Sequence, residues 1–226
     1  MFFHPMDFLI IIAFVLAMWA QSKVKTNFER WSNVRASSGM NGAAVARNIL
    51  NQEGLHNVRI ELSKNGALSD HYDPSSKTVR LSEPVYHGNS IAALSVAAHE
   101  VGHAIQHHTK YPMLVLRHRL FPLANLGSQL APMLLIGGFL LNIMNLVGLG
   151  IAFFAGAVLF QVVTLPVEFN ASSRAKDKLI EMGLISSNEE KGVGNVLNAA
   201  ALTYVASTLI ALLQLIKFIM IFRGRR

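Results

Sequence analysis

Three long apolar blocks constrain the fold of this chain more than any other feature. They cover residues 8–20, which residues 1–6 extend, then residues 120–166 and residues 199–222. The 226 residues are 52% hydrophobic and only 15% charged. About 20 consecutive apolar residues suffice for a helix to cross the hydrocarbon core of a bilayer. The sequence therefore predicts an integral membrane protein in contact with the lipid bilayer.

The second block exceeds one span and has a polar break at residues 142–145. It predicts two helices joined by a tight turn, roughly residues 126–141 and 146–165. Together with the first and third blocks, this gives about four transmembrane helices. Gln214 and Lys217 interrupt the third block. A helix that packs along the membrane instead of crossing it is therefore the alternative for that block.

Basic residues gather beside the apolar blocks and raise the net charge to +7. Lys23, Lys25, Arg30 and Arg35 directly follow the first block. Positive flanks mark the cytoplasmic side of a span, so we expect the chain after the first helix to lie in the cytoplasm. Because the charge is explained in this way, no nucleic-acid partner is expected.

The sequence His-Glu-Val-Gly-His occupies positions 99–103. Residues four apart share one face of a helix, so His99 and His103 can offer their imidazoles to a single metal ion. Glu100 would lie beside the open coordination position, where a carboxylate can take a proton from water. Two imidazoles favour zinc, although the spacing alone admits other divalent metals. A buried helix whose histidines are satisfied by hydrogen bonds is the alternative.

A third ligand must come from a carboxylate, because the chain contains no cysteine. Glu168 is the first carboxylate after the second apolar block and lies where a helix would leave the membrane. It completes a His-His-Glu site for one zinc ion per chain. An interfacial glutamate paired with Arg174 is the alternative, and Asp177 is a competing ligand.

Between the first two apolar blocks, the pattern predicts a helix at residues 41–52 and a small sheet of two or three strands near residues 58–62 and 78–82. Residues 70–73 are predicted to be a polar cluster at the end of a strand, where His71 either has a catalytic or substrate-polarising role or lies on the surface in an Asx-type turn. His107 and His108 are predicted to be a solvated helix end, and Ser187 to Glu190 a capping box that opens a further helix.

Several longer motifs accompany His-Glu-Val-Gly-His. They are Ser-Asp-His-Tyr-Asp-Pro at 69–74, Lys-Thr-Val-Arg-Leu-Ser at 77–82, Leu-Pro-Val-Glu-Phe-Asn-Ala-Ser at 165–172 and Ala-Ala-Ala-Leu-Thr-Tyr-Val-Ala at 199–206. With them, the chain resembles the YugP-type neutral zinc metallopeptidases of bacterial membranes over nearly its full length. It is also similar to the wider gluzincin group that includes HtpX. There a Glu-x-x-Ala-Asp stretch supplies the third ligand, whereas Ser172 stands here at the aspartate position.

The resemblance implies a zinc endopeptidase of the bacterial cell membrane with its site on the cytoplasmic side. Its substrates would be membrane or membrane-adjacent proteins, and its oligomeric state is open. Glu100 would be the general base, and His71, Tyr204 and Arg174 are candidates to stabilise the oxyanion. An extended substrate could pair as a strand beside residues 78–82.

Two other functions remain open. A site-2-type intramembrane protease also uses this histidine pattern, but it takes its third ligand from an aspartate on a later membrane helix. No apolar span after His103 contains one. A membrane scaffold or chaperone-like protein with a structural zinc site would need no Glu100. A transporter is disfavoured because the apolar segments carry few polar residues.

The fold class expected is a mainly α membrane protein with a small zincin-like α+β catalytic part. The expected division is an anchor at 1–22, the catalytic part at 23–119 and a helical hairpin at 120–166. The third-ligand helix and the helix after it follow at 167–202, and a C-terminal helix with a basic tail at 203–226.

Overall fold

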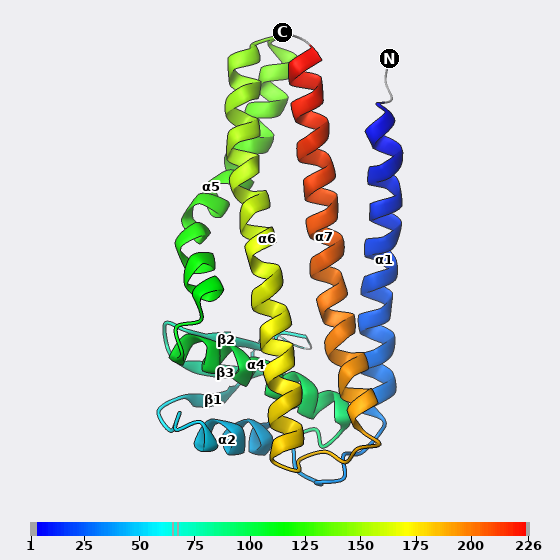
Figure 1. Cartoon of the computed structure of the whole chain (residues 1–226), viewed down its shortest axis with the longest axis vertical. Helices are drawn as coiled ribbons and strands as arrows, with labels where there is room; N and C mark the ends of the chain where they lie inside the picture. The colour runs from blue at the N-terminus through cyan, green and yellow to red at the C-terminus, as the bar shows by residue number, and fades with distance from the viewer. Residues whose placement is uncertain (1–3, 65, 67, 225–226) are drawn as a thin grey trace. The chain divides into compact units, whose positions relative to one another are not determined.

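The computed structural model describes residues 4–64, 66 and 68–224 (Figure 1). Residues 1–3 of the predicted anchor and 225–226 of the basic tail lie outside this part. The elements in chain order are α1 (Pro5–Ser32), α2 (Gly42–Gln52), β1 (Arg59–Leu62), β2 (His71–Asp73), β3 (Thr78–Leu81), α3 (Glu83–Tyr86), α4 (Ile91–His108), α5 (Pro112–Leu140), α6 (Met144–Glu181) and α7 (Glu190–Gly224). The mainly helical class with one small sheet is confirmed for the described residues.

The chain forms two compact units. The first contains Met1–Ala20, Pro112–Pro166 and Leu202–Arg226, and the second contains Gln21–Tyr111 and Val167–Ala201. Helices α1, α6 and α7 each contribute residues to both units. The five-part division expected from the sequence stays a prediction.

Four helices, α1, α5, α6 and α7, are long and apolar enough to cross a membrane. They contain 28, 29, 38 and 35 residues, and the prediction of four spans is confirmed in length and composition. The sequence separated a membrane helix ending near residue 165 from the third-ligand helix after it, but α6 runs without interruption through Pro166. Proline removes one backbone donor and can kink a helix without ending it, which is why the boundary was misplaced.

In the first unit, small residues let the helices approach closely. A Cβ atom added at Gly127 of α5 would lie 2.4 Å from the carbonyl oxygen of Phe153 in α6. Van der Waals packing of this kind holds helices together in lipid, where apolar burial alone gives no preference for protein over lipid.

An ion pair joins the first and last helices of this unit. The ammonium of Lys217 in α7 donates to the carboxylate of Asp7 in α1, and both side chains are largely buried. Lys217 is one of the polar residues that interrupt the third apolar block, and the structure gives its charge a partner. A paired charge costs much less in an apolar environment than a single one.

In the second unit the sheet has the order β1-β3-β2, with β1 parallel and β2 antiparallel to β3. Residues 71–73, predicted to lie at a strand end with an Asx-type turn as the alternative, form strand β2. Because β3 pairs on both sides, the prediction that a substrate could pair beside residues 78–82 is wrong. The outer edges of the sheet belong to β1 and β2.

Helix α4 is the centre of the second unit, and most of its side chains are buried. Ser90 caps the start of α4, since its hydroxyl accepts a hydrogen bond from the backbone N–H of Ala93 at 3.2 Å. The predicted capping box before α7 is shifted by one residue. Glu189 accepts from the backbone N–H of Ser186 at 2.6 Å and from that of Ser37 at 2.7 Å. Its carboxylate thus links the connection after α1 to the start of α7.

The Asp7–Lys217 pair gives the first testable expectation. Lys217→Met leaves the partly buried carboxylate of Asp7 without its ammonium partner, and Asp7→Asn leaves the ammonium of Lys217 without its carboxylate. Each change is expected to lower the thermal unfolding midpoint in detergent. The double variant should recover part of the loss, because no single charge remains. Losses that simply add in the double variant would show that the pair contributes nothing to stability.

Candidate metal centre

The two histidines of the HExxH motif project from one face of α4. Their ring centroids lie 4.8 Å apart with an angle of 87° between the planes. The His99 and His103 side chains are only 15% and 13% exposed. The four-residue spacing on a buried helix thus turns both imidazoles toward one place.

Glu168 reaches the same place from α6. Its Oε2 lies 3.4 Å from Nε2 of His99 and 3.6 Å from Nε2 of His103, and the residue is 4% exposed. The three ligand atoms all lie within 4.8 Å of one another. Tetrahedral zinc with bonds of about 2.0–2.2 Å separates neighbouring ligand atoms by about 3.4 Å. The two histidine–glutamate separations and the donor set therefore fit a zinc ion.

The approach of α4 to α6 at this point depends on a glycine. A Cβ added at Gly102 would lie 2.6 Å from the backbone carbonyl oxygen of Ala171, which is itself fully buried. Gly102 lies between the two histidines, and Ala171 lies one turn after Glu168. A larger side chain at either position would separate the helix that carries the imidazoles from the helix that carries the carboxylate.

Each histidine has a hydrogen-bond partner at the ring nitrogen that faces away from Glu168. Nδ1 of His99 lies 3.2 Å from the hydroxyl of Ser172, and Nδ1 of His103 lies 3.0 Å from Oε1 of Gln106. Partners of this kind fix the ring orientation and place the metal-binding lone pair on Nε2. Ser172 thus occupies the place of the aspartate in the gluzincin pattern, and its hydroxyl contacts the histidine.

Gln106 was missed in the sequence, although it lies three residues after His103 and hence near it on the helix surface. The side chain is fully buried, and its amide donates to the backbone carbonyl of Val167 at 2.8 Å and to Oδ1 of Asn170 at 3.0 Å. The same Oδ1 accepts from Nε of Arg174 at 2.8 Å. A polar chain therefore runs from α6 through Gln106 to the ring of His103.

The electrostatics of the site favour a positive charge. Burial opposes the protonated form of His103, but the contacts with Glu168 and the nearby carboxylate of Glu100 outweigh burial and raise the pKa of the imidazole. Glu100 is 8% exposed. A site that stabilises an imidazolium without a metal also stabilises a divalent cation, which then competes with the proton.

The predicted oxyanion-stabilising residues lie on three different elements. His71 belongs to β2, where its Nδ1 lies 2.8 Å from the carbonyl oxygen of Ser69. Arg174 belongs to α6 and donates to Asn170. Tyr204 belongs to α7 in the unit that holds the candidate spans. Their catalytic roles, like those of the ligands and of Glu100, stay predictions.

Fold and site together define a helical membrane protein with a candidate His-His-Glu zinc site on two packed helices. Residues 6–223 match the family described as "Putative neutral zinc metallopeptidase", and the chain belongs to this family. It is 58% identical over 219 residues to the "Putative membrane protease YugP" of Bacillus subtilis (strain 168), with 97% of each chain covered. The comparison with solved structures gave no match.

Gly102→Ala tests the close approach of α4 and α6. The added methyl group would meet the Ala171 carbonyl, so the helices must separate, and we expect a loss of about 1–3 kcal/mol in unfolding free energy together with weaker zinc binding. Gly194→Ala is the matched control, because a Cβ there meets nothing within 4 Å. This control lies inside α7 and should raise stability by up to about 1 kcal/mol. Equal effects of the two variants on zinc affinity would contradict the packing argument.

Gln106→Leu tests the support of His103. The change removes the acceptor at Nδ1 and should weaken zinc binding about 10- to 100-fold, measured by competition with a chelator. Gln106→Glu keeps an acceptor for the imidazole but cannot donate to the Val167 carbonyl. Stronger zinc binding by Gln106→Glu than by Gln106→Leu would assign the effect to the ring contact. Wild-type affinity in Gln106→Leu would show that Gln106 only joins the helices.

Proposed function

We propose that the chain is a membrane-embedded zinc endopeptidase that hydrolyses peptide bonds of membrane or membrane-adjacent proteins. The observation that supports this best is the convergence of His99, His103 and Glu168 at zinc-ligand spacing beside the buried Glu100. Membership of a zinc metallopeptidase family and the likeness to a protein named as a membrane protease support the same reaction class.

In this proposal His99, His103 and Glu168 hold one zinc ion per chain. The bound zinc would supply Lewis-acid chemistry toward a peptide carbonyl and a water molecule. Glu100 takes a proton from the attacking water at its carboxylate and then passes it to the leaving amine. Ser172 and Gln106 hold the imidazoles so that Nε2 points at the shared position.

The oxyanion that develops at the carbonyl needs a further donor, and His71, Arg174 and Tyr204 remain the candidates. The basic flank after α1 supports a cytoplasmic site, because Lys23, Lys25, Arg30 and Arg35 follow the first span. A site at that membrane boundary would meet proteins in the membrane or next to it.

A structural zinc site in a scaffold protein is the second candidate. Structural zinc sites have four protein ligands, whereas catalytic sites keep one position open. Within the described residues the candidate group has three ligands. A site with three protein ligands supports a catalytic zinc ion. The nearby carboxylate of Glu100 also supports catalysis, because a structural site needs no general base.

The test compares wild type with Glu100→Gln, both purified in detergent. We expect about one zinc per chain in both proteins, because Glu100 is not among the proposed ligands. Cleavage of an unfolded protein substrate should fall about 10²- to 10⁴-fold in the variant, since it lacks the base. A chelator should abolish wild-type cleavage, and added zinc should restore it.

His103→Ala is the matched variant at the metal itself and should lose both zinc and cleavage. If wild type and Glu100→Gln both bind zinc and cleave the substrate at equal rates, Glu100 is excluded as the base. A wild-type protein that never binds zinc would contradict the proposed function altogether.

A further inference from the structure

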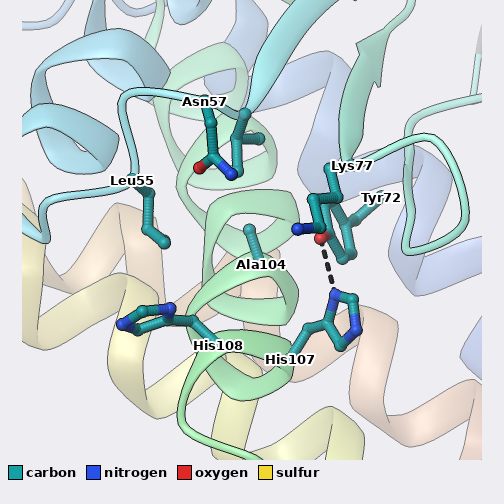
Figure 2. A pocket seen from close by; sticks show the side chains of 8 residues that line it. Leu55, Asn57, Tyr72, Lys77, Ala104, His107 and His108 are labelled. Carbon is teal, nitrogen blue, oxygen red and sulfur yellow. Dashed lines mark hydrogen bonds between the residues drawn. The ribbon is translucent and has the colours of Figure 1, made fainter.

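A cavity with a volume of about 200 Å³ lies in the same unit as the candidate metal centre. Figure 2 shows its walls, which come from the last turns of α4, the segment before β1, strand β2 and the turn between β2 and β3. Besides the three apolar residues Leu55, Val58 and Ala104, the lining consists of Asn57, Tyr72, Lys77, His107 and His108.

The polar lining consists of hydrogen-bond donors and contains no carboxylate. Lys77 and a protonated His108 carry positive charge, and the amide of Asn57 can donate, whereas the hydroxyl of Tyr72 is already hydrogen-bonded to His107. The neighbouring carboxylate of Asp73 follows Tyr72 on β2 and therefore points to the other face of the strand. There Asp73 accepts from Arg80 at 3.1 Å and from serine hydroxyls.

His107 is held in the wall by a contact between distant segments. Its Nδ1 lies 2.8 Å from the hydroxyl of Tyr72, and the two rings are 5.8 Å apart between centroids. The prediction of a solvated helix end is therefore wrong for His107. Burial lowers the pKa of this imidazole, and the positive charges of Lys77 and His108 lower it further. The lowered pKa favours the neutral form of His107, so the positive charge at the cavity comes from Lys77 and from His108 when it is protonated.

Lys77 occupies a backbone position that suits glycine. Its φ is +48°, in the left-handed region that side chains other than glycine seldom adopt, and its carbonyl accepts from the backbone N–H of Arg59 at 3.1 Å. Figure 2 shows the Lys77 side chain beside Tyr72 on one side of the cavity, opposite Leu55. The backbone contact with Arg59 therefore fixes the turn that carries the Lys77 side chain at the cavity wall.

The cavity lies close to the metal centre along α4. Ala104 follows Glu100 by one turn, and His107 follows His103 by one turn. One turn corresponds to about 5–6 Å along the helix, and an extended peptide covers about 3.3 Å per residue. An extended substrate that runs from the metal centre along α4 would place a group two or three residues from the cleaved bond at the cavity.

We propose that this cavity binds a carboxylate of the peptide substrate and so selects acidic sequences for cleavage. The carboxylate is either an aspartate or glutamate side chain or the C-terminus, two or three residues from the cleaved bond. Lys77 and His108 bind it through charged hydrogen bonds, and the Tyr72–His107 pair completes the wall. This inference rests on the proposed peptidase function.

The experiment uses the zinc-loaded full-length protein and pairs of quenched-fluorescent peptides. The peptides of a pair differ only by glutamate or glutamine at one position two or three residues from the cleaved bond. A further pair differs by a free or an amidated C-terminus. We expect the wild type to prefer the carboxylate by about 10- to 100-fold in kcat/KM, the size of a charge-assisted hydrogen bond. The pair that shows the preference identifies which carboxylate is bound.

Lys77→Met and His108→Leu should lose this preference and still cleave the neutral peptides at the wild-type rate. Lys77→Gly should lose it while keeping or raising the unfolding temperature, because glycine relieves the strained φ, and Lys77→Arg should retain it. Lys191→Met is the matched control, since it removes an exposed lysine of α7 outside the cavity wall. The proposal would be overturned if Lys77→Met lowered kcat/KM equally on both peptides of a pair, or if it left the preference for the carboxylate unchanged.

A binding measurement separates failure of this proposal from failure of the peptidase function. The Glu100→Gln protein is titrated with an acetylated tripeptide that has a free C-terminus and then with its amide, while the ring resonances of His107 are followed. If the His107 resonances shift with the free-acid peptide but not with its amide, and do not shift in Lys77→Met, the carboxylate site is supported even without cleavage. No shift with either peptide, or displacement of the acid by phosphatidylglycerol added to the micelles, would refute a peptide-carboxylate site.

Discussion

The close contact between α4 and α6 is the constraint on which the candidate metal centre depends. Gly102 and Ala171 meet backbone to backbone, and no side chain can enter between them. The histidines flank Gly102, and Glu168 lies one turn before Ala171. This single register therefore brings the three ligand atoms together. Because protein interiors are close-packed, a shift of either helix would separate the two imidazoles on α4 from the carboxylate on α6.

Hydrogen bonds then convert this packing into defined ring orientations. The fully buried amide of Gln106 joins the backbone of α6 to the ring of His103, and Ser172 of α6 reaches the ring of His99. Both supports cross between the same two helices that supply the ligands. A metal site needs its first ligands held to within about 0.5 Å, which packing alone seldom provides. Buried polar groups whose hydrogen bonds are all satisfied provide the remaining positional precision.

Sequence patterns predicted the parts of this site that depend on helical spacing, and the structure brings His99, His103 and Glu168 together as expected. They did not predict contacts between distant segments. The sequence does not distinguish Gln106 from other polar residues, because its partner Val167 is distant in the chain. Residues 70–73 have the composition of a turn, and only pairing with β3 makes residues 71–73 a strand. His107 was predicted to be solvated because it lies at a helix end and its partner, Tyr72, is 35 residues away in the sequence, so the contact could not be predicted.

The length of α6 relates the site to the membrane. Its 38 residues correspond to about 57 Å at 1.5 Å per residue, whereas the hydrocarbon core of a bilayer is about 30 Å thick. Glu168 lies 24 residues after Met144, about 36 Å along the helix. A helix that spans the core from its first turns therefore carries this carboxylate just beyond the far boundary. The candidate span and Glu168, the candidate third ligand, therefore belong to one continuous helix that is unbroken at Pro166.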